Sequence, residues 1–286
     1  MIVALVLLSA FLHALWNALL RLEEEKDRSL VVAIGVATLF AAGVGGVRWG
    51  MGEVLFASPR GVGFTVLAGV MEAIYFATLA RAMELGKLGV VYTISRGGAV
   101  VAAWPLSIAL FGEAATLSSL AGSVVVVGGL ALSGLGAGGG DGAGGDSRRG
   151  AVGWAMACAG SIAGYHLAYA AALNEAVNPS ACFALSLGVS VAINATRLAR
   201  AGRAAGLGAL IGRRWRRLLV MGLVSGGSFL ILMEALARGG PGYVLTLRNT
   251  SVLFATAMGW WIGERPGRAV VVGAALVAAG ATLLAL

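Results

Sequence analysis

Charged residues are scarce in this sequence: they make up 12% of its 286 residues, whereas soluble proteins carry about 25%. Hydrophobic residues make up 59%. A soluble domain could not be covered with polar surface by so few charges, because large apolar areas would have to face water. The composition therefore excludes an ordinary soluble protein. It indicates an integral membrane protein whose main partner is the lipid bilayer.

Cysteine is scarce as well, and the two residues present, Cys158 and Cys182, lie inside apolar segments without metal-binding or disulfide-framework spacing. No ATP-binding motif is present, and we expect neither a metal nor a cofactor. The glycines of GLGAGGGDGAGGDSRRG follow an apolar segment rather than a strand, so they indicate a flexible linker. The net charge of +8 does not indicate nucleic-acid binding, because the basic residues lie mostly between apolar segments.

Long apolar segments are abundant. A transmembrane helix needs about 20 mostly apolar residues. Ten segments meet this need, at residues 2–20, 30–47, 61–83, 88–111, 118–135, 151–173, 180–198, 218–236, 242–262 and 269–286. The expected fold is an all-α integral membrane protein with ten transmembrane helices. The helices form two sets of five, residues 1–135 and 151–286, joined by the Gly-rich linker at 136–150.

The two sets resemble each other in sequence. The only histidines, in SAFLHALWNALLR and SIAGYHLAYAAALNE, lie 153 residues apart, each followed three positions later by an aromatic residue. Arg96 and Arg248 lie 152 residues apart, and the Gly-Glu pairs at 112–113 and 263–264 lie 151 apart. These pairs are expected to end helices in tight turns. Because five is odd, the second set enters the membrane from the opposite side, which predicts two inverted repeats, a common plan for secondary transporters.

The Lys and Arg residues predict the orientation of the chain. Loops after the first, third, fifth, seventh and ninth segments carry 16 of the 21, and the other loops carry 3. Because cytoplasmic loops are rich in Lys and Arg, both termini are expected to face away from the cytoplasm. Arginine outnumbers lysine 19 to 2, which is typical of a GC-rich bacterial genome and indicates a bacterial inner (cytoplasmic) membrane.

Several stretches resemble a known family. HALWN in the first segment, ARAMELGKLGVVYTISRG before and within the fourth, FGE after it and LRNTSVLFATAMGWWIGER in the ninth are similar to the ten-helix, EamA-like branch of the drug/metabolite transporter superfamily. The resemblance implies a membrane transporter of small metabolites, amino acids or drugs, and many such proteins are exporters. Relatives often have a proline where Thr93 stands and an acid where Asn249 stands, so substrate and coupling are not transferred. They are usually described with cytoplasmic termini, opposite to the charge count here.

Polar residues inside the predicted helices are the candidate functional residues. A charged group at bilayer depth costs about 2.5–3.5 kcal/mol on insertion scales, so it needs a partner or a function. Helical spacing places several polar residues on single helix faces. The candidate substrate-binding or coupling residues are His13, Trp16, Asn17, Glu72, Tyr75, Tyr92, Arg96, His166, Tyr169 and Arg248. None is expected to be catalytic or to bind a metal.

The two arginines admit three interpretations. In the first, they bind an anionic group of the substrate, such as a carboxylate, phosphate or phosphonate, while Glu72 or a histidine exchanges protons. In the second, they pair with Glu72 and Glu234 in a structural ion-pair network. In the third, one arginine is structural and the other binds.

The expected function is secondary transport of a small anionic or amino-acid-like metabolite, or a drug, by alternating access, in the direction of export and without enzyme activity. A flippase for lipids or lipid-linked carriers would share this architecture. An intramembrane serine hydrolase using Ser228 and His166 is a weaker alternative, because VSGGSF lacks the G-x-S-G setting of such a nucleophile. Stripes of small residues in the fifth and tenth segments allow close packing within one chain or in a homodimer.

Overall fold

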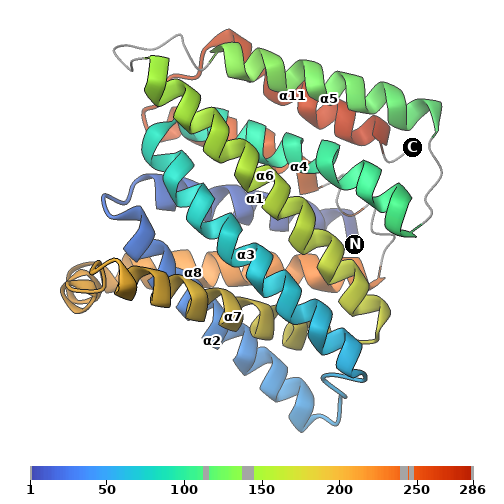
Figure 1. Cartoon of the computed structure of the whole chain (residues 1–286), viewed down its shortest axis with the longest axis vertical. Helices are drawn as coiled ribbons and strands as arrows, with labels where there is room; N and C mark the ends of the chain where they lie inside the picture. The colour runs from blue at the N-terminus through green and yellow to red at the C-terminus, as the bar shows by residue number, and fades with distance from the viewer. Residues whose placement is uncertain (1, 112–115, 137–144, 239–243, 245–247, 285–286) are drawn as a thin grey trace.

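The computed structural model describes residues 2–111, 116–136, 145–238, 244 and 248–284 (Figure 1). Ten helices are described. They are α1 (Ile2–Arg21), α2 (Lys26–Gly50), α3 (Pro59–Leu85), α4 (Leu88–Phe111), α5 (Leu117–Gly136), α6 (Gly145–Asn174), α7 (Pro179–Arg200), α8 (Leu207–Arg238), α10 (Ser251–Trp261) and α11 (Arg268–Leu284). No strand occurs among these residues, and the predicted all-α class is confirmed.

Six helices, α1, α2, α3, α6, α7 and α8, are each long and apolar enough to cross a membrane. Helices α5 and α11 contain shorter apolar stretches, Leu120–Ser133 and Arg268–Leu283. The chain is therefore a multi-pass membrane protein. Helix α4 has the predicted bounds, and α3, α5 and α7 begin and end within two residues of theirs. These agreements arise because hydropathy, the signal used for the prediction, also decides which residues enter the bilayer.

Helices α8 and α6 begin well before their predicted first residues. Helix α8 begins at Leu207, eleven residues early, and its backbone is non-helical at Arg214 (φ −127°, ψ 17°). Residues 207–217 of the segment that was predicted as a loop are thus part of α8, and the kink lies among their arginines. Residues 145–150 of the predicted linker belong to α6. Both helices begin outside their apolar segments because a helix can extend beyond the hydrocarbon core of the bilayer. Residues 137–144 of the linker, Gly112–Glu113 and part of the ninth predicted segment lie outside the described residues.

Ion pairs bring loops together at one end of the bundle. The Nε of Arg21 lies 2.6 Å from Oε1 of Glu264, and Oε2 of Glu264 accepts a hydrogen bond from the backbone N of Leu88 (2.7 Å). Gly263 has a φ of +86°, so the Gly-Glu pair at 263–264 forms the predicted tight turn. Asp27 pairs with both Arg197 and Arg203. We call this the arginine-rich end; it comprises residues 21–28, 84–88, 197–217 and 262–268.

The opposite end is held by a different set of contacts. The Nη2 of Arg48 lies 2.5 Å from Oε1 of Glu234, which joins the end of α2 to the end of α8. The Ser58 hydroxyl donates to Oε2 of Glu175 (2.7 Å), which joins the start of α3 to the end of α6. Helix α1 therefore ends at the arginine-rich end, whereas its predicted counterpart α6 ends at the opposite one.

Helices from the two halves interlock instead of forming separate bundles. Helix α3 packs against α6 and α7, and α8 packs against α1 and α2. Helices α5 and α11 lie side by side along one edge of the molecule, at the top of Figure 1. Suppose that α1, α2 and α3 correspond to α6, α7 and α8. The contact of α3 with α6 then corresponds to that of α8 with α1, and the contact of α3 with α7 corresponds to that of α8 with α2. This pattern supports the predicted repeat, and the inversion stays a prediction.

Two glycines make equivalent close contacts in the two halves. A Cβ on Gly69 of α3 would lie 2.5 Å from the carbonyl oxygen of Ser186 in α7. A Cβ on Gly222 of α8 would lie 2.6 Å from the carbonyl oxygen of Ala33 in α2. Each partner in the second contact lies 153 residues from its counterpart in the first. Only glycine allows the two backbones to approach so closely.

Replacing Gly222 by alanine is therefore expected to destabilise the protein. Its new methyl group would press on the backbone of α2, which costs about 1–3 kcal/mol for an overpacked site. A Cβ added at Gly227 of the same helix would meet nothing within 4 Å. The matched Gly227→Ala change should raise stability by up to about 1 kcal/mol through helix propensity. Thermal unfolding of both variants in detergent is the measurement, and equal melting temperatures would contradict the close contact.

Candidate functional site

Arg248 is fully buried, with 0% of its surface exposed. Its Nη1 donates to the hydroxyl of Ser9 (2.7 Å), and its Nη2 lies 2.9 Å from Nδ1 of His13. The guanidinium carbon lies 4.7 Å from the ring centre of Phe229, a cation–π contact. Arg248 thus connects the residues before α10 with both α1 and α8.

The contacts of His13 fix its tautomer. The indole Nε1 of Trp16 donates to the same Nδ1 from 3.2 Å. Indole and guanidinium N–H groups can only donate, so Nδ1 accepts from both and the ring proton lies on Nε2. His13 is therefore neutral in this arrangement. Its Nε2–H is buried and has no hydrogen-bond partner among the described residues.

Arg96 is buried nearly as deeply, with 4% exposed. Its Nε and Nη1 are buried and have no hydrogen-bond partner in the described part of the chain. It lies one helical turn after Tyr92 on α4, and its charge interacts electrostatically with the phenol groups of Tyr92 and Tyr165. It also interacts with the charge of Arg248. Two positive groups that repel each other therefore lie in the same buried region.

Neither arginine has a carboxylate partner among the described residues. Glu234 pairs with Arg48 and Arg238 at the opposite end of the bundle, and Glu72 forms no ion pair in the described structure. The structural interpretation, in which Glu72 and Glu234 neutralise Arg96 and Arg248, is therefore wrong for this arrangement. Sequence alone places a residue at a depth along its helix but does not give the direction in which its helix face points.

Glu72 lies in a neighbouring polar cluster. The Tyr169 hydroxyl donates to Oε1 of Glu72 (2.6 Å) and lies 2.6 Å from the hydroxyl of Ser186. Oε2 of Glu72 is buried without a partner among the described residues. The rings of Tyr165 and Tyr169 are 5.7 Å apart, so Tyr165 separates this cluster from the arginines. The carboxyl group of Glu72 therefore lies in the protein interior with no described cation beside it.

Aromatic rings join the predicted residues into one region. The His13 ring centre lies 5.2 Å from that of Phe229 and 6.0 Å from that of Tyr92. Tyr165 continues this set, with its ring centre 4.4 Å from His166 and 5.6 Å from Tyr75. These contacts come from α1, α3, α4, α6 and α8. The region therefore lies where helices of both halves meet.

Buried polar atoms without partners are concentrated in this region. Buried polar groups nearly always form hydrogen bonds, so such atoms are informative. Among the described residues, the region holds His13 Nε2, Tyr92 OH, Arg96 Nε and Nη1, Tyr165 OH, His166 Nδ1, Arg248 Nε and Ser251 Oγ. Most can donate a hydrogen bond. The arrangement is suited to a ligand that accepts several hydrogen bonds and carries negative charge.

Of the ten predicted site residues, seven meet in this region: His13, Trp16, Tyr75, Tyr92, Arg96, His166 and Arg248. Glu72 and Tyr169 form the adjacent cluster. Asn17 donates from Nδ2 to the carbonyl of His13 (2.8 Å), so its amide is used within its own helix.

Four contributors to the site are absent from the ten candidate residues: Ser9, Tyr165, Ser186 and Phe229. Phe229 lies 153 residues after Phe76, so the repeat contained a signal for it. Ser186 is one of several serines on α7, and nothing in the sequence distinguishes it.

The expected nucleophile of the hydrolase alternative is engaged elsewhere. The Ser228 hydroxyl donates to the carbonyl of Ser9 (2.9 Å), and the Ser9 hydroxyl donates to the carbonyl of Ser228 (2.7 Å). This reciprocal pair joins α1 to α8. The Ser228–His166 contact that a hydrolase would need is not formed.

Comparison with known proteins assigns the second half of the chain to a family. Residues 150–286 match the model of the EamA-like transporter family. The second half of the chain is an EamA-like domain of the drug/metabolite transporter superfamily. This family suggests a membrane transporter of small solutes. The EamA-like domain includes α7, α8, α10, α11 and all but the first residues of α6. It supplies Arg248, His166, Tyr165 and Phe229 to the region.

A solved structure gives the fold of the whole chain. It is titled "Crystal structure of protein" and matches with a TM-score of 0.66 at 17% identity, covering 98% of this chain and 96% of that chain. At this identity the likeness shows the fold alone. The likeness extends over both halves, and not only over the EamA-like domain. A comparison with curated proteins gave no match.

The two arginines are expected to respond differently to replacement by methionine, which has a similar length and no charge. Arg96→Met removes a buried charge with no carboxylate partner, so the melting temperature should stay the same or rise. Arg248→Met removes the donor to Ser9 and one of the two donors to His13, which costs about 1–3 kcal/mol. Thermal unfolding of the two variants side by side tests this. A fall with Arg96→Met as large as that with Arg248→Met would show that Arg96 is a structural residue.

Proposed function

We propose that this chain is a secondary transporter that moves a small metabolite bearing an anionic group by alternating access. The observation that carries the proposal is the pair of buried arginines, Arg96 and Arg248, without carboxylate partners among the described residues. The family suggests small-solute transport, and the region between the halves gives the chemistry of the solute.

The charge of this region favours an anion over a cation. Each unpaired charge at bilayer depth costs about 2.5–3.5 kcal/mol on insertion scales. A carboxylate, phosphate or phosphonate placed between the two guanidinium groups would offset this cost through charge-assisted hydrogen bonds. The Nε2–H of His13 offers a further donor, and the rings of Tyr92, Tyr165 and Phe229 offer apolar contacts for the rest of the molecule. An amino-acid-like compound satisfies the same requirement through its carboxylate.

The interlocked packing supports alternating access, because the binding region lies between helices of both halves, as it does in transporters built from inverted repeats. The direction of transport, export, is proposed from the family resemblance. The proposed location is a bacterial inner membrane with both termini outside the cytoplasm. The 16 Lys and Arg residues in the loops assigned to the cytoplasmic side support this orientation.

Glu72 is the proposed proton-exchanging residue. It is fully buried, and Tyr169, which donates a hydrogen bond to it, is neutral. No described cation pairs with it, so the neutral acid is the form that this environment favours. Its hydrogen-bond partner Tyr169 has its ring centre 5.7 Å from that of Tyr165, which borders the arginine region. Proton release and uptake by Glu72 would then couple a proton gradient to binding.

The substrate class can be tested by thermal unfolding of the purified protein with sets of small anions, zwitterions and cations. A ligand at a hundred times its dissociation constant should stabilise the folded protein by about 2.7 kcal/mol. We expect anions or zwitterions to stabilise the wild-type protein and to lose that effect in Arg96→Met, which is expected to fold normally.

Two results would contradict the proposed substrate class. One is stabilisation by cations alone, and the other is undiminished stabilisation of Arg96→Met by the same anions. The matched control is Arg81→Met, which removes an exposed arginine that pairs with Glu84 on the surface of α3 and should leave the ligand effect unchanged.

The proton role can be tested with Glu72→Gln in liposomes. The variant keeps the shape of the side chain but cannot release a proton. It should bind substrate and exchange it across the membrane, while an imposed pH gradient no longer causes net accumulation. Glu84→Gln on the exposed surface is the control and should respond to the gradient as the wild type does. Gradient-dependent accumulation by Glu72→Gln would assign coupling to another residue.

A further inference from the structure

The arginine-rich end carries more positive charge than its own acids neutralise. The segment from 197 to 217 contains seven arginines. Four of them, Arg197, Arg203, Arg214 and Arg217, pair with the acidic residues Glu23, Glu24 and Asp27 of the loop after α1 and the start of α2. The other three, Arg200, Arg213 and Arg216, pair with no carboxylate of the described residues. Positive charge therefore remains at this end after the internal ion pairs form.

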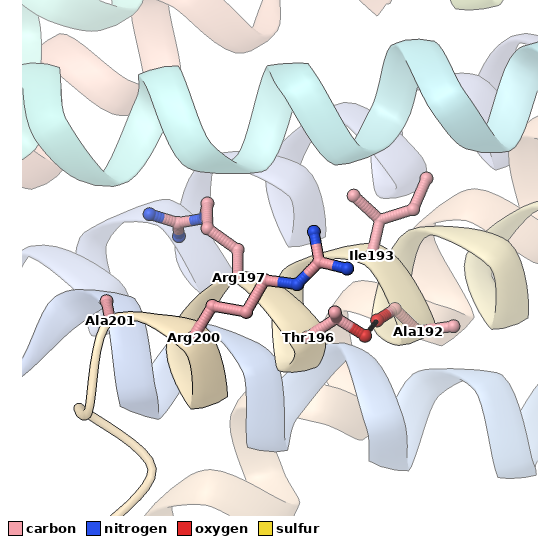
Figure 2. Close-up of a pocket in the computed structure, with 6 residues that line it drawn as sticks. All are labelled: Ala192, Ile193, Thr196, Arg197, Arg200 and Ala201. Atoms are coloured by element: carbon pink, nitrogen blue, oxygen red, sulfur yellow. Dashed lines mark hydrogen bonds between the residues drawn. The ribbon is translucent and has the colours of Figure 1, made fainter.

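One of these three arginines lies in a hollow on the outer surface of α7. The hollow has a volume of about 800 Å³ and is lined by Ala192, Ile193, Thr196, Arg197, Arg200 and Ala201 (Figure 2). These residues follow one face of α7 and its C-terminal cap. The lining is therefore cationic near the end of the helix and apolar one to two turns further in.

The direction of the Arg200 side chain is unusual for the end of a transmembrane helix. Arginine side chains at such positions normally extend outward to water. Figure 2 shows the guanidinium group of Arg200 running back along α7 toward Ile193, away from that of Arg197. Arg197 is occupied by Asp27, with Nη2 lying 2.7 Å from Oδ1. Arg200 thus directs an unpaired charge toward the apolar part of the hollow.

We propose that this hollow binds the headgroup of an anionic phospholipid. The phosphate would contact Arg200, and an acyl chain would lie along Ala192 and Ile193. Ile193 is 41% exposed, which is consistent with contact to lipid rather than to protein. From Arg200 to Ile193 the helix rises about 10 Å, enough to pass from the headgroup level into the upper acyl region. Arginine forks match phosphate oxygens, which favours a phosphate over a zwitterionic surface alone.

This lipid site is independent of the proposed transport function. It lies on the outside of α7, whereas Arg96 and Arg248 lie inside the bundle. The expected occupant is a lipid of the leaflet on the arginine-rich side, where anionic lipids attract basic segments.

The test uses the full chain in neutral detergent, titrated with short-chain phosphatidylglycerol, with phosphatidylcholine of the same chain length, and with inorganic phosphate. Thermal unfolding reports apparent affinity. Phosphatidylglycerol should stabilise the protein saturably, and phosphatidylcholine and inorganic phosphate should not. Arg200→Gln should weaken the phosphatidylglycerol effect about fivefold. Ala192→Trp, which fills the hollow without changing charge, should weaken it as well.

The matched control is Arg216→Gln, which removes one charge from the same end but outside the hollow, where Arg216 stacks on Trp215. It should leave the phosphatidylglycerol affinity unchanged. An equal loss in Arg216→Gln and Arg200→Gln would show diffuse attraction to the charged end and overturn the site. Stabilisation by inorganic phosphate alone would indicate a free anion as the ligand. Equal stabilisation by phosphatidylcholine, which has the same phosphate but no net charge, would overturn the preference for an anionic headgroup.

Discussion

Two arginine charges are buried away from water, and no carboxylate of the described residues pairs with them. The rest of the structure depends on how these two charges are accommodated. Arg248 is accommodated by neutral partners: the Ser9 hydroxyl, the accepting nitrogen of His13 and the face of Phe229. These partners satisfy donors but supply no negative charge. Two donors of Arg96, Nε and Nη1, have no hydrogen-bond partner among the described residues. The helices of both halves therefore surround a positive region that no described carboxylate neutralises.

Most of the acidic residues that the structure describes lie where they cannot neutralise Arg96 and Arg248. Glu23, Asp27 and Glu264 are paired at the arginine-rich end, and Glu234 is paired at the opposite end. Unlike these acids, Glu72 is buried inside the bundle, but it accepts a hydrogen bond from Tyr169 in a separate cluster. Charges are thus matched at the two water-facing ends and unmatched in the middle. Ion pairs thus join the loops at the two ends, whereas the positive charge in the middle of the bundle is free to bind an anion.

The sequence predicted the helices better than the site. Hydropathy specifies where a segment enters the bilayer, so the bounds of α4 and its neighbours agreed closely. It does not specify the rotation of one helix against another, and the interpretation that pairs Arg248 with an acid failed for that reason. The repeat offset pointed to equivalent histidines and arginines, and applied consistently it would also have pointed to Phe229. The start of α8 was missed because the arginines at residues 213–217 lower the hydropathy there, whereas the helix continues through them.

The two glycine contacts decide which parts of the molecule can move as rigid bodies. Gly69 holds α3 of the first half against the backbone of α7 of the second, and Gly222 holds α8 of the second half against α2 of the first. Rocking one half against the other would pull both pairs apart, and no rearranged side chain could replace contacts made by backbone. Each moving body must therefore combine helices from both halves. In the proposed alternating access, the boundary between the moving bodies would then run through the predicted repeats and not between them.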